Sequence, residues 1–245
     1  MLKRLKTLSL KRKGDTMIIG LDAGHTLSGA GTGASSKYAS ETVKNREILN
    51  KLTAILREKG HTVVNCTIDK SSNDLADRVA IANAQNLDLF VSLHLNAFKE
   101  TIDGMGVETY IWNGSWADKE SNRAIAKRVN DKLVKNIGWK NRGVKEANYY
   151  VLKNTVAPAI LVELGFCDSK RDMELWDTTK IAKSLFEGIT NTAYTPTTTS
   201  SSTTTSGDTY FRVIVGSYKN RDNAVAQQNK LKSAGFDSFL EAFKK

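Results

Sequence analysis

Hydrophobic residues along the chain form two alternating patterns: short unbroken runs, and longer stretches in which apolar side chains recur every three or four positions. The unbroken runs predict strands over Met17–Asp22, His61–Thr67, Asp88–Leu93, Val107–Trp112, Tyr149–Leu152 and Ala159–Leu164. The helical spacing predicts helices over Glu41–Lys59, Asp74–Gln85, Trp116–Lys135 and Met173–Ile189. Strands that are apolar throughout and alternate with helices are typical of a parallel sheet buried on both faces. We therefore expect an α/β fold with a twisted, mostly parallel sheet and helices on both faces.

This alternation ends at a change in composition near the C-terminus. Residues 192–209 are almost all Thr and Ser, which bury too little apolar surface to order themselves, and they predict a linker. The linker separates a large domain, 17–191, from a small unit, 210–245. Residues 1–16 contain six Lys and Arg against one Asp. We expect them to be a disordered tail; the alternative is a short basic helix on a membrane surface.

The charge balance of the chain favours an anionic partner. There are 36 Lys and Arg against 26 Asp and Glu, a formal net charge of +10, and half of the excess lies in residues 1–16. Nucleic acid, a membrane surface or anionic wall polymers would all fit such a charge. Because the sequence has no basic recognition helix and no aromatic residues interleaved with Lys and Arg, we expect no nucleic-acid binding. It also has no run of 18 apolar residues, so we expect no stable membrane insertion.

The cysteines and the N-terminus bear on where the chain folds. Cys66 and Cys167 lie about a hundred residues apart, which is no disulfide framework, and they are expected to be reduced thiols. The basic N-terminus lacks the apolar run of a secretory signal. We therefore expect the chain to be made in the cytoplasm without a signal peptide.

The chain has only three histidines, and two of them follow predicted strands. His25 comes directly after the first strand and His94 ends the third, so both are expected at the carboxyl edge of the sheet, where ligands bind in such folds. His61 opens the second strand at the opposite edge and is expected to be a surface residue. Two imidazoles at one edge favour a shared metal ion, whereas the alternative is that each is an ordinary hydrogen-bonded histidine.

Two glutamates are candidates to complete this site. Glu41 opens the helix that follows the His25 loop, and a catalytic zinc typically takes three protein ligands. The alternative is an ordinary first-turn acid that interacts with the helix dipole. Glu163 lies in the otherwise apolar run AILVELGF, where an ionised carboxylate is costly unless it has a function or a counter-charge. Beside a metal, it would transfer protons as a general acid and base.

Several segments, in order, resemble the zinc-dependent N-acetylmuramoyl-L-alanine amidases of the amidase-3 family. The segments are DAGH (22–25), Glu41 leading into a helix, DRVAIANAQNLDLFVSLHLNA (77–97), GVETYIW (106–112), RGVKEANYYVL (142–152) and PAILVELGFCDSKRD (158–172). They span essentially all of 17–190. The family's first motif usually reads Asp-Pro-Gly-His-Gly, so Ala23 and Thr26 depart from it.

This resemblance implies a six-stranded α/β fold, and an enzyme that cuts the amide between N-acetylmuramic acid and L-alanine in bacterial peptidoglycan. It places one zinc ion on His25, Glu41 and His94, and the catalytic role on Glu163. Asn96 follows His94 by two positions and is a candidate for binding substrate or for capping a turn. Arg142 is a candidate for binding a substrate carboxylate, against the alternative of a solvated loop charge.

Residues 210–245 resemble half of a SPOR domain, a peptidoglycan-binding module built from two βαβ units. A strand over 210–215, a helix over Asp222–Lys232 and a strand over Ser238–Ala242 make up one such unit. A lone unit leaves strand edges unpaired. One hypothesis is that two chains pair their halves into a homodimer; the other interpretation is a truncated or weakly ordered tail.

We expect a peptidoglycan hydrolase, and the alternative on the same fold is a catalytically inactive wall-binding protein. A wall enzyme made in the cytoplasm reaches its substrate after lysis or through a holin-type pore. A phage endolysin and a sporulation enzyme for mother-cell lysis both fit this expectation, and the sequence does not choose between them.

Overall fold

The protein was analysed as a computed structural model that describes residues 15–29, 31–196, 216–233 and 240. The chain divides into two compact units, Met1–Thr197 and Thr198–Lys245. The basic tail at 1–16 lies almost wholly outside the described residues. So do the two strands expected in the C-terminal unit, and the homodimer expected through them remains a prediction.

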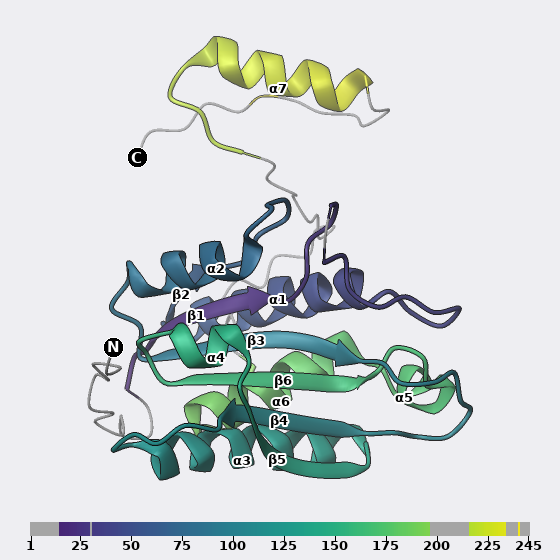
Figure 1. Ribbon diagram of the computed structural model, residues 1–245. Helices are drawn as coiled ribbons and strands as arrows, with labels where there is room; N and C mark the ends of the chain where they lie inside the picture. The colour runs from purple at the N-terminus through teal and green to yellow at the C-terminus, as the bar shows by residue number, and fades with distance from the viewer. Residues whose placement is uncertain (1–14, 30, 197–215, 234–239, 241–245) are drawn as a thin grey trace, which may run out of the picture. The chain divides into compact units, whose positions relative to one another are not determined.

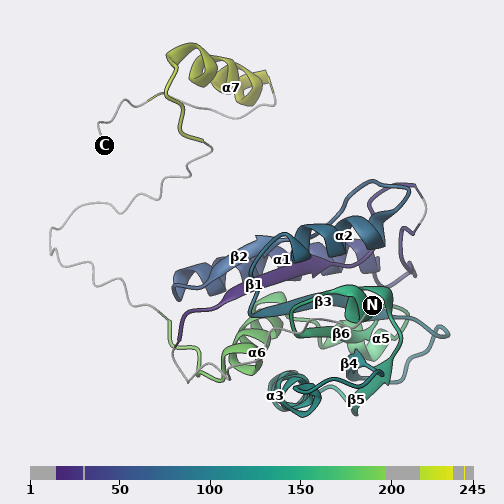
Figure 2. The same cartoon turned by 60° about the vertical axis from the view of Figure 1, so that its left-hand side comes forward.

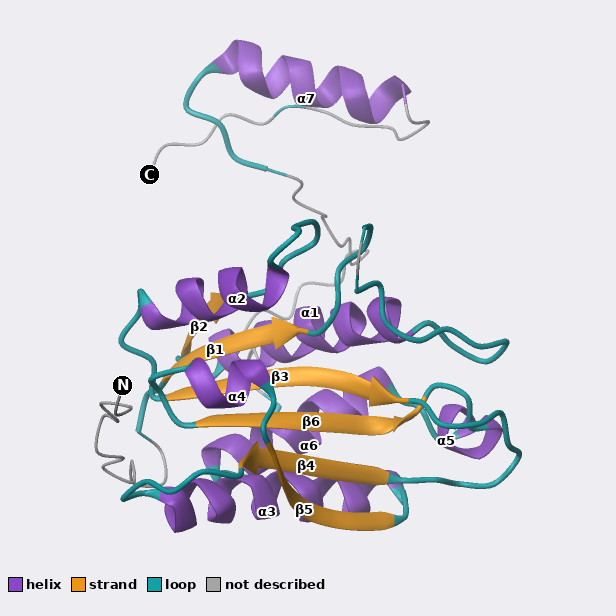
Figure 3. Ribbon diagram, in the orientation of Figure 1, coloured by secondary structure: helices purple, strands orange, loops and turns teal. Residues whose placement is uncertain are grey.

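The first unit is built on one six-stranded sheet with the strand order β2-β1-β3-β6-β4-β5. The strands are β1 (Ile18–Ala23), β2 (Thr62–Asn65), β3 (Leu89–Asn96), β4 (Val107–Trp112), β5 (Asn141–Ala147) and β6 (Ala159–Phe166). Every neighbouring pair is parallel except β4 with β6. Figure 3 shows the arrowheads of β1, β3 and β6 at one edge of the sheet and that of β4 at the other. The start of β4 therefore lies at the edge where β3 and β6 end.

Helices cover both faces of the sheet (Figure 1). One face packs against α1 (Glu41–Glu58), α3 (Lys119–Ile137) and α6 (Thr178–Thr190), which bury the larger apolar core. Figure 2 shows α3 almost end-on beside β4 and β5. The other face carries α2 (Asp74–Asn83) and the short α4 (Tyr150–Asn154), with a smaller apolar cluster. The expected α/β fold with a mostly parallel six-stranded sheet is thus confirmed.

The amphipathic helix α1 illustrates how the sequence specifies this packing. Its apolar side chains Ile48, Leu52, Ile55 and Leu56 recur at helical spacing and are at most 4% exposed. The helix closes at Gly60, whose φ of +82° is readily adopted only by a residue without a Cβ. Packing of this face fixes α1 against the sheet and places its first residue, Glu41, at the carboxyl edge of β3.

Two secondary-structure predictions were wrong. Tyr149–Leu152 is not a strand, because α4 begins at Tyr150 and buries Val151 and Leu152; a short apolar run does not by itself distinguish a buried strand from a buried helical turn. The sixth strand is instead β5. Its sequence, NRGVKEA, is polar because it is an edge strand with no fully buried residue. The last predicted helix is divided between α5 (Lys170–Glu174) and α6.

His61 is also placed differently from expectation. It lies at the far edge of the sheet as predicted, but it is buried rather than on the surface. Its Nδ1 accepts a hydrogen bond of 3.2 Å from the Met17 amide. Cys66 and Cys167 are buried and form no disulfide, as expected.

In the C-terminal unit the structure describes the helix α7 (Arg221–Ser233). This confirms the helix predicted over Asp222–Lys232. No helix in the described part of the chain is long and apolar enough to cross a membrane.

Candidate active site

The three expected ligands meet at the carboxyl edge of the sheet. His25 follows β1, and His94 lies near the end of β3. Glu41 Oε1 lies 3.0 Å from His25 Nε2 and 3.1 Å from His94 Nδ1. The two imidazole rings cross edge to face, with their centroids 4.9 Å apart. The two histidines therefore lie together at the carboxyl edge of the sheet, as the sequence predicts.

Hydrogen bonds fix the orientation of the three side chains. Glu41 is 3% exposed, and its second oxygen accepts the Ala34 amide at 2.9 Å. The Nδ1 atom of His25 lies 3.0 Å from the Gly31 carbonyl oxygen. If Nδ1 carries the proton, it donates to that carbonyl and leaves Nε2 to bind a metal, as ligating histidines commonly do.

The backbone of His25 is held in an uncommon conformation. Its φ is +65°, one of two positive values at non-glycine residues in the described chain. Its carbonyl oxygen accepts hydrogen bonds from Arg78 at 2.7 Å and from Arg46 at 3.0 Å. Next to it, a Cβ on Gly24 would lie 2.1 Å from the His94 ring. The loop therefore requires glycine here, so that the backbone passes close to the second histidine.

The donor set fits a zinc ion. Two imidazole nitrogens and a carboxylate oxygen, all within 4.8 Å of one another, match the His₂Glu set of mononuclear zinc hydrolases. Adjacent ligands of a tetrahedral zinc lie about 3.3 Å apart, given bonds of about 2.0 Å. The Glu41 distances of 3.0 and 3.1 Å are close to this separation. Among the described residues, this is the one group of His, Cys, Asp or Glu arranged to hold a metal ion.

Electrostatics keep the Glu41 carboxylate ionised. Burial alone would raise the pKa of Glu41, but hydrogen bonds from His25 and His94 hold it well below its usual value. Burial likewise opposes protonation of His94, yet the Glu41 carboxylate raises the pKa of that imidazole above its ordinary value. The Glu41 carboxylate thus favours the protonated form of His94 when no cation is bound. A metal ion bound here displaces that proton.

Glu163 lies beside the metal ligands on β6, directly opposite His94 in the register of β3 and β6. Burial raises the pKa of its carboxyl to about 7. Its Oε2 atom is buried and has no hydrogen-bond partner in the described structure. A carboxyl with a pKa near neutrality gains and loses a proton readily, which suits a general acid and base.

A second buried carboxylate, Glu108, faces the same region from β4. It is 1% exposed and is the register partner of Glu163. Its oxygens accept hydrogen bonds from four side chains: Asn96 at 2.7 Å, Arg142 at 2.7 Å, Tyr110 at 2.9 Å, and Lys145. These contacts outweigh burial and lower the pKa of Glu108. Glu108 therefore stays ionised and organises the side chains around it.

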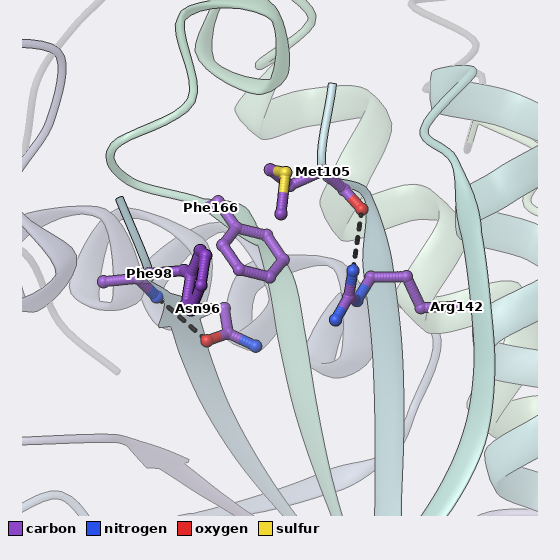
Figure 4. A pocket seen from close by; sticks show the side chains of 6 residues that line it. Asn96, Phe98, Met105, Arg142 and Phe166 are labelled. Carbon is purple, nitrogen blue, oxygen red and sulfur yellow. Dashed lines mark hydrogen bonds between the residues drawn. The ribbon is translucent and has the colours of Figure 1, made fainter. Parts of the chain in front are cut away.

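Both expected substrate-binding candidates belong to this cluster. They line a pocket of about 230 Å³ together with Ala97, Phe98, Met105 and Phe166. Figure 4 shows the Arg142 guanidinium beside Met105 and Phe166, with Asn96 and Phe98 on the opposite side. Arg142 lies in β5 and forms an ion pair with Glu108. The alternative interpretation, in which Arg142 is a solvated charge in a loop, is therefore wrong. Whether either residue contacts substrate remains a prediction.

Glu108 lies within GVETYIW (106–112), one of the segments that resemble the family, but no role for it was predicted from the sequence. The argument applied to Glu163, that a carboxylate in an apolar strand needs a partner or a function, would have singled it out. Two further polar residues, Arg78 and Asn83, have structural partners. Arg78 pairs with buried Asp22, while Asn83 bonds to the Asn154 carbonyl and the Val156 amide.

The fold and the site together define an α/β protein with a His-Glu-His cluster suited to one metal ion, next to a buried glutamate of raised pKa. The chain belongs to the N-acetylmuramoyl-L-alanine amidase family, Amidase_3, whose profile matches residues 19–193. A SPOR domain profile matches residues 179–240. Both resemblances drawn from the sequence are thus confirmed. The SPOR match begins within α6, upstream of the expected unit at 210–245.

Named relatives agree with this family. The endolysin of Bacillus phage SPP1 is 35% identical over 175 residues, which cover 70% of this chain and 62% of the endolysin. A sporulation-specific N-acetylmuramoyl-L-alanine amidase of Bacillus subtilis is 28% identical over 226 residues, covering 90% of this chain and 82% of that protein. The crystal structure of an N-acetylmuramoyl-L-alanine amidase from Clostridium difficile 630 aligns with a TM-score of 0.63 at 28% identity, covering 72% of this chain and 96% of that one.

Proposed function

We propose that the protein is a zinc-dependent hydrolase of the amide bond between N-acetylmuramic acid and L-alanine in bacterial peptidoglycan. The observation that carries this proposal is the placement of Glu163 beside the His25, Glu41 and His94 cluster at one edge of the sheet. We infer which bond is cut from membership of the N-acetylmuramoyl-L-alanine amidase family. The alternative, an inactive wall-binding protein, is disfavoured because all four side chains are present and converge.

A zinc ion on the three ligands would polarise the scissile carbonyl and lower the pKa of water. Glu163 is placed to accept a proton from the attacking water as the C–O bond forms. The same carboxyl then donates that proton to the amide nitrogen as the C–N bond breaks. The products are the lactyl carboxylic acid and the free amino group of the peptide. One residue can perform both transfers, because a carboxyl whose pKa is raised toward neutrality both accepts and donates a proton readily.

The remaining part of the chain fits a wall substrate. The SPOR match and the peptidoglycan module it describes support binding to the wall by the C-terminal region. The net charge of +10 is compatible with anionic wall polymers. Release by lysis or through a holin-type pore remains our proposal for how the enzyme reaches its substrate, in either the endolysin or the sporulation setting.

Hydrolysis of purified cell walls tests the proposal. The native protein should clear walls and release free L-alanine amino groups, lose this activity with a chelator and regain it with zinc. Glu163→Gln should bind zinc and walls without clearing them. Wall binding without clearing by the native, zinc-loaded protein would instead identify a binding protein. Clearing that a chelator does not affect would refute the zinc mechanism.

A further inference from the structure

The pocket next to the candidate active site is lined by Arg142, whose guanidinium is fixed in position and only partly neutralised. Arg142 Nε donates to Glu108 at 2.7 Å, and its Nη1 lies 3.5 Å from the Met105 carbonyl oxygen. Its guanidinium carbon lies 4.9 Å from the centroid of the Phe166 ring. The side chain is 27% exposed. The outer nitrogens of the guanidinium can therefore bind a ligand without breaking the bond to Glu108.

The charges of this cluster favour an anion. Glu108 is ionised and pairs with two cations, Arg142 and Lys145. One negative charge between two positive ones leaves the group of Glu108, Arg142 and Lys145 with a net charge of +1. Arg binds carboxylates with two parallel hydrogen bonds, and Glu108 fixes the guanidinium so that little side-chain entropy is lost on binding. Asn96 is the second polar group of the pocket, and its amide is likewise held by Glu108.

The size of the pocket limits its occupant to one residue of a substrate. Its volume of about 230 Å³ is below the roughly 300–1,000 Å³ of sites that enclose a drug-sized ligand. Phe98, Met105 and Phe166 provide apolar walls that suit the methylene groups of a short side chain. A small anionic residue with an aliphatic stem matches both the charge and the walls.

The pocket adjoins the proposed reaction centre along β3. Asn96 follows His94 by two positions in β3, and two extended residues span about 7 Å. In the proposed substrate the scissile bond precedes L-alanine, and the next residue is a D-glutamate joined through its γ-carboxyl. Its α-carboxylate is therefore free and lies about two residue lengths from the scissile nitrogen.

We propose that this pocket binds the free α-carboxylate of the second stem-peptide residue, with Arg142 as the residue that determines specificity for it. This inference rests on the proposed amidase function. It makes the enzyme selective for stem peptides in which that carboxyl is free, over those in which it is a carboxamide. A carboxamide is uncharged and offers only one acceptor oxygen, so it loses the paired interaction with the guanidinium.

The test compares two synthetic substrates, N-acetylmuramoyl-L-alanyl-D-isoglutamyl-L-lysine and its D-isoglutaminyl counterpart. The zinc-loaded native protein should cleave the carboxylate form with a kcat/KM about tenfold or more above that of the carboxamide. Arg142→Met should bring this ratio close to one, chiefly by raising KM for the carboxylate form. Arg142→Lys keeps a cation beside Glu108 but lacks the planar guanidinium that donates two parallel hydrogen bonds. This variant should retain only part of the preference for the carboxylate form.

A matched control is Arg123→Met. Arg123 also pairs with glutamates, Glu120 and Glu146, but on the α3 side of β5; its loss should leave the ratio unchanged. Equal cleavage of both substrates by the native protein, or a ratio unaltered in Arg142→Met, would overturn the inference while leaving the amidase function intact. Cleavage of neither substrate by the native protein would overturn both.

Discussion

Arg78 and Asp22 form an ion pair in which each side chain is only 1% exposed. Asp22 is in β1, three positions before His25, and Arg78 reaches it from α2. The same guanidinium donates to the carbonyl oxygens of Ala23, His25 and Ile68 at 2.8, 2.7 and 3.0 Å. This buried pair therefore joins the sheet to the loop that presents the first metal ligand.

Replacing Arg78 with Met should strongly destabilise the fold. The substitution leaves the Asp22 carboxylate buried without a counter-charge, a change that costs on the order of 3–5 kcal/mol. Chemical denaturation of the two proteins measures the loss. The surface variant Arg123→Met is the control and should lose much less. Similar losses in both variants would mean that the buried pair contributes little.

Replacing Glu41 with Gln should abolish stoichiometric zinc binding, whereas Glu163→Gln should keep it. Glu41 supplies the oxygen that both imidazoles approach. Glu163 lies beside the cluster without belonging to it. Metal analysis after dialysis should give about one zinc per chain for the native protein and for Glu163→Gln. Activity should fall by about 10²-fold or more in both variants. Loss of zinc from Glu163→Gln would place that residue among the ligands.

In the metal-free protein, Glu163 should make stability depend on pH. The folded state binds its proton more tightly than the unfolded chain, because burial raises the pKa from 4.5 to about 7. The contribution of this carboxyl to stability is therefore greatest below pH 4.5 and is lost as the pH rises through about 7, a change of at most about 3 kcal/mol. Glu163→Gln removes this ionisation. With a chelator present, the stability of the variant relative to the native protein should rise between pH 5 and pH 8. A difference independent of pH would contradict the buried state of this carboxyl.

Glu108→Gln should affect substrate binding more than turnover. The substitution weakens the contacts that hold Arg142 and Asn96, so KM should increase more than kcat decreases. It also removes a negative charge that raises the pKa of Glu163. The acid limb of the pH profile of kcat/KM should consequently move to lower pH. A lower kcat with unchanged KM and an unshifted profile would argue against this positioning role.

The convergence of His25, Glu41, His94 and Glu163 could be predicted because each occupies a conspicuous position in the sequence. His25 and His94 follow apolar strands, Glu41 begins a helix, and Glu163 interrupts an apolar strand. The edges of a parallel sheet bring such positions together, so the order of elements along the chain was sufficient to infer that they meet.

The surrounding pocket could not be inferred in this way. It depends on β4 running against its neighbour β6, which brings Glu108 to the edge where β6 ends. It also depends on β5, whose polar sequence carries no apolar run and was not predicted as a strand. The direction of a strand depends on packing across the whole sheet, so it cannot be predicted from the local spacing of hydrophobic residues. The burial of His61 likewise depends on the packing around it, including the aromatic ring of Phe186.

The reversal of β4 brings a second set of side chains to the edge of the sheet that carries the proposed reaction centre. The groups proposed for the reaction lie after β1, at the start of α1 and within β3 and β6. Those proposed for recognition come from β4, β5 and the segment 97–106, together with the last residues of β3 and β6. We expect substitutions in the segment 97–106 and β5 to leave His25, Glu41 and His94 in place, because none of these three residues belongs to those segments. Related enzymes on this scaffold can thus diverge in the wall chemotype they prefer while retaining one reaction centre. Exchange of residues 97–106 together with β5 between such enzymes offers a direct route to altering the bacterial range of a lytic protein.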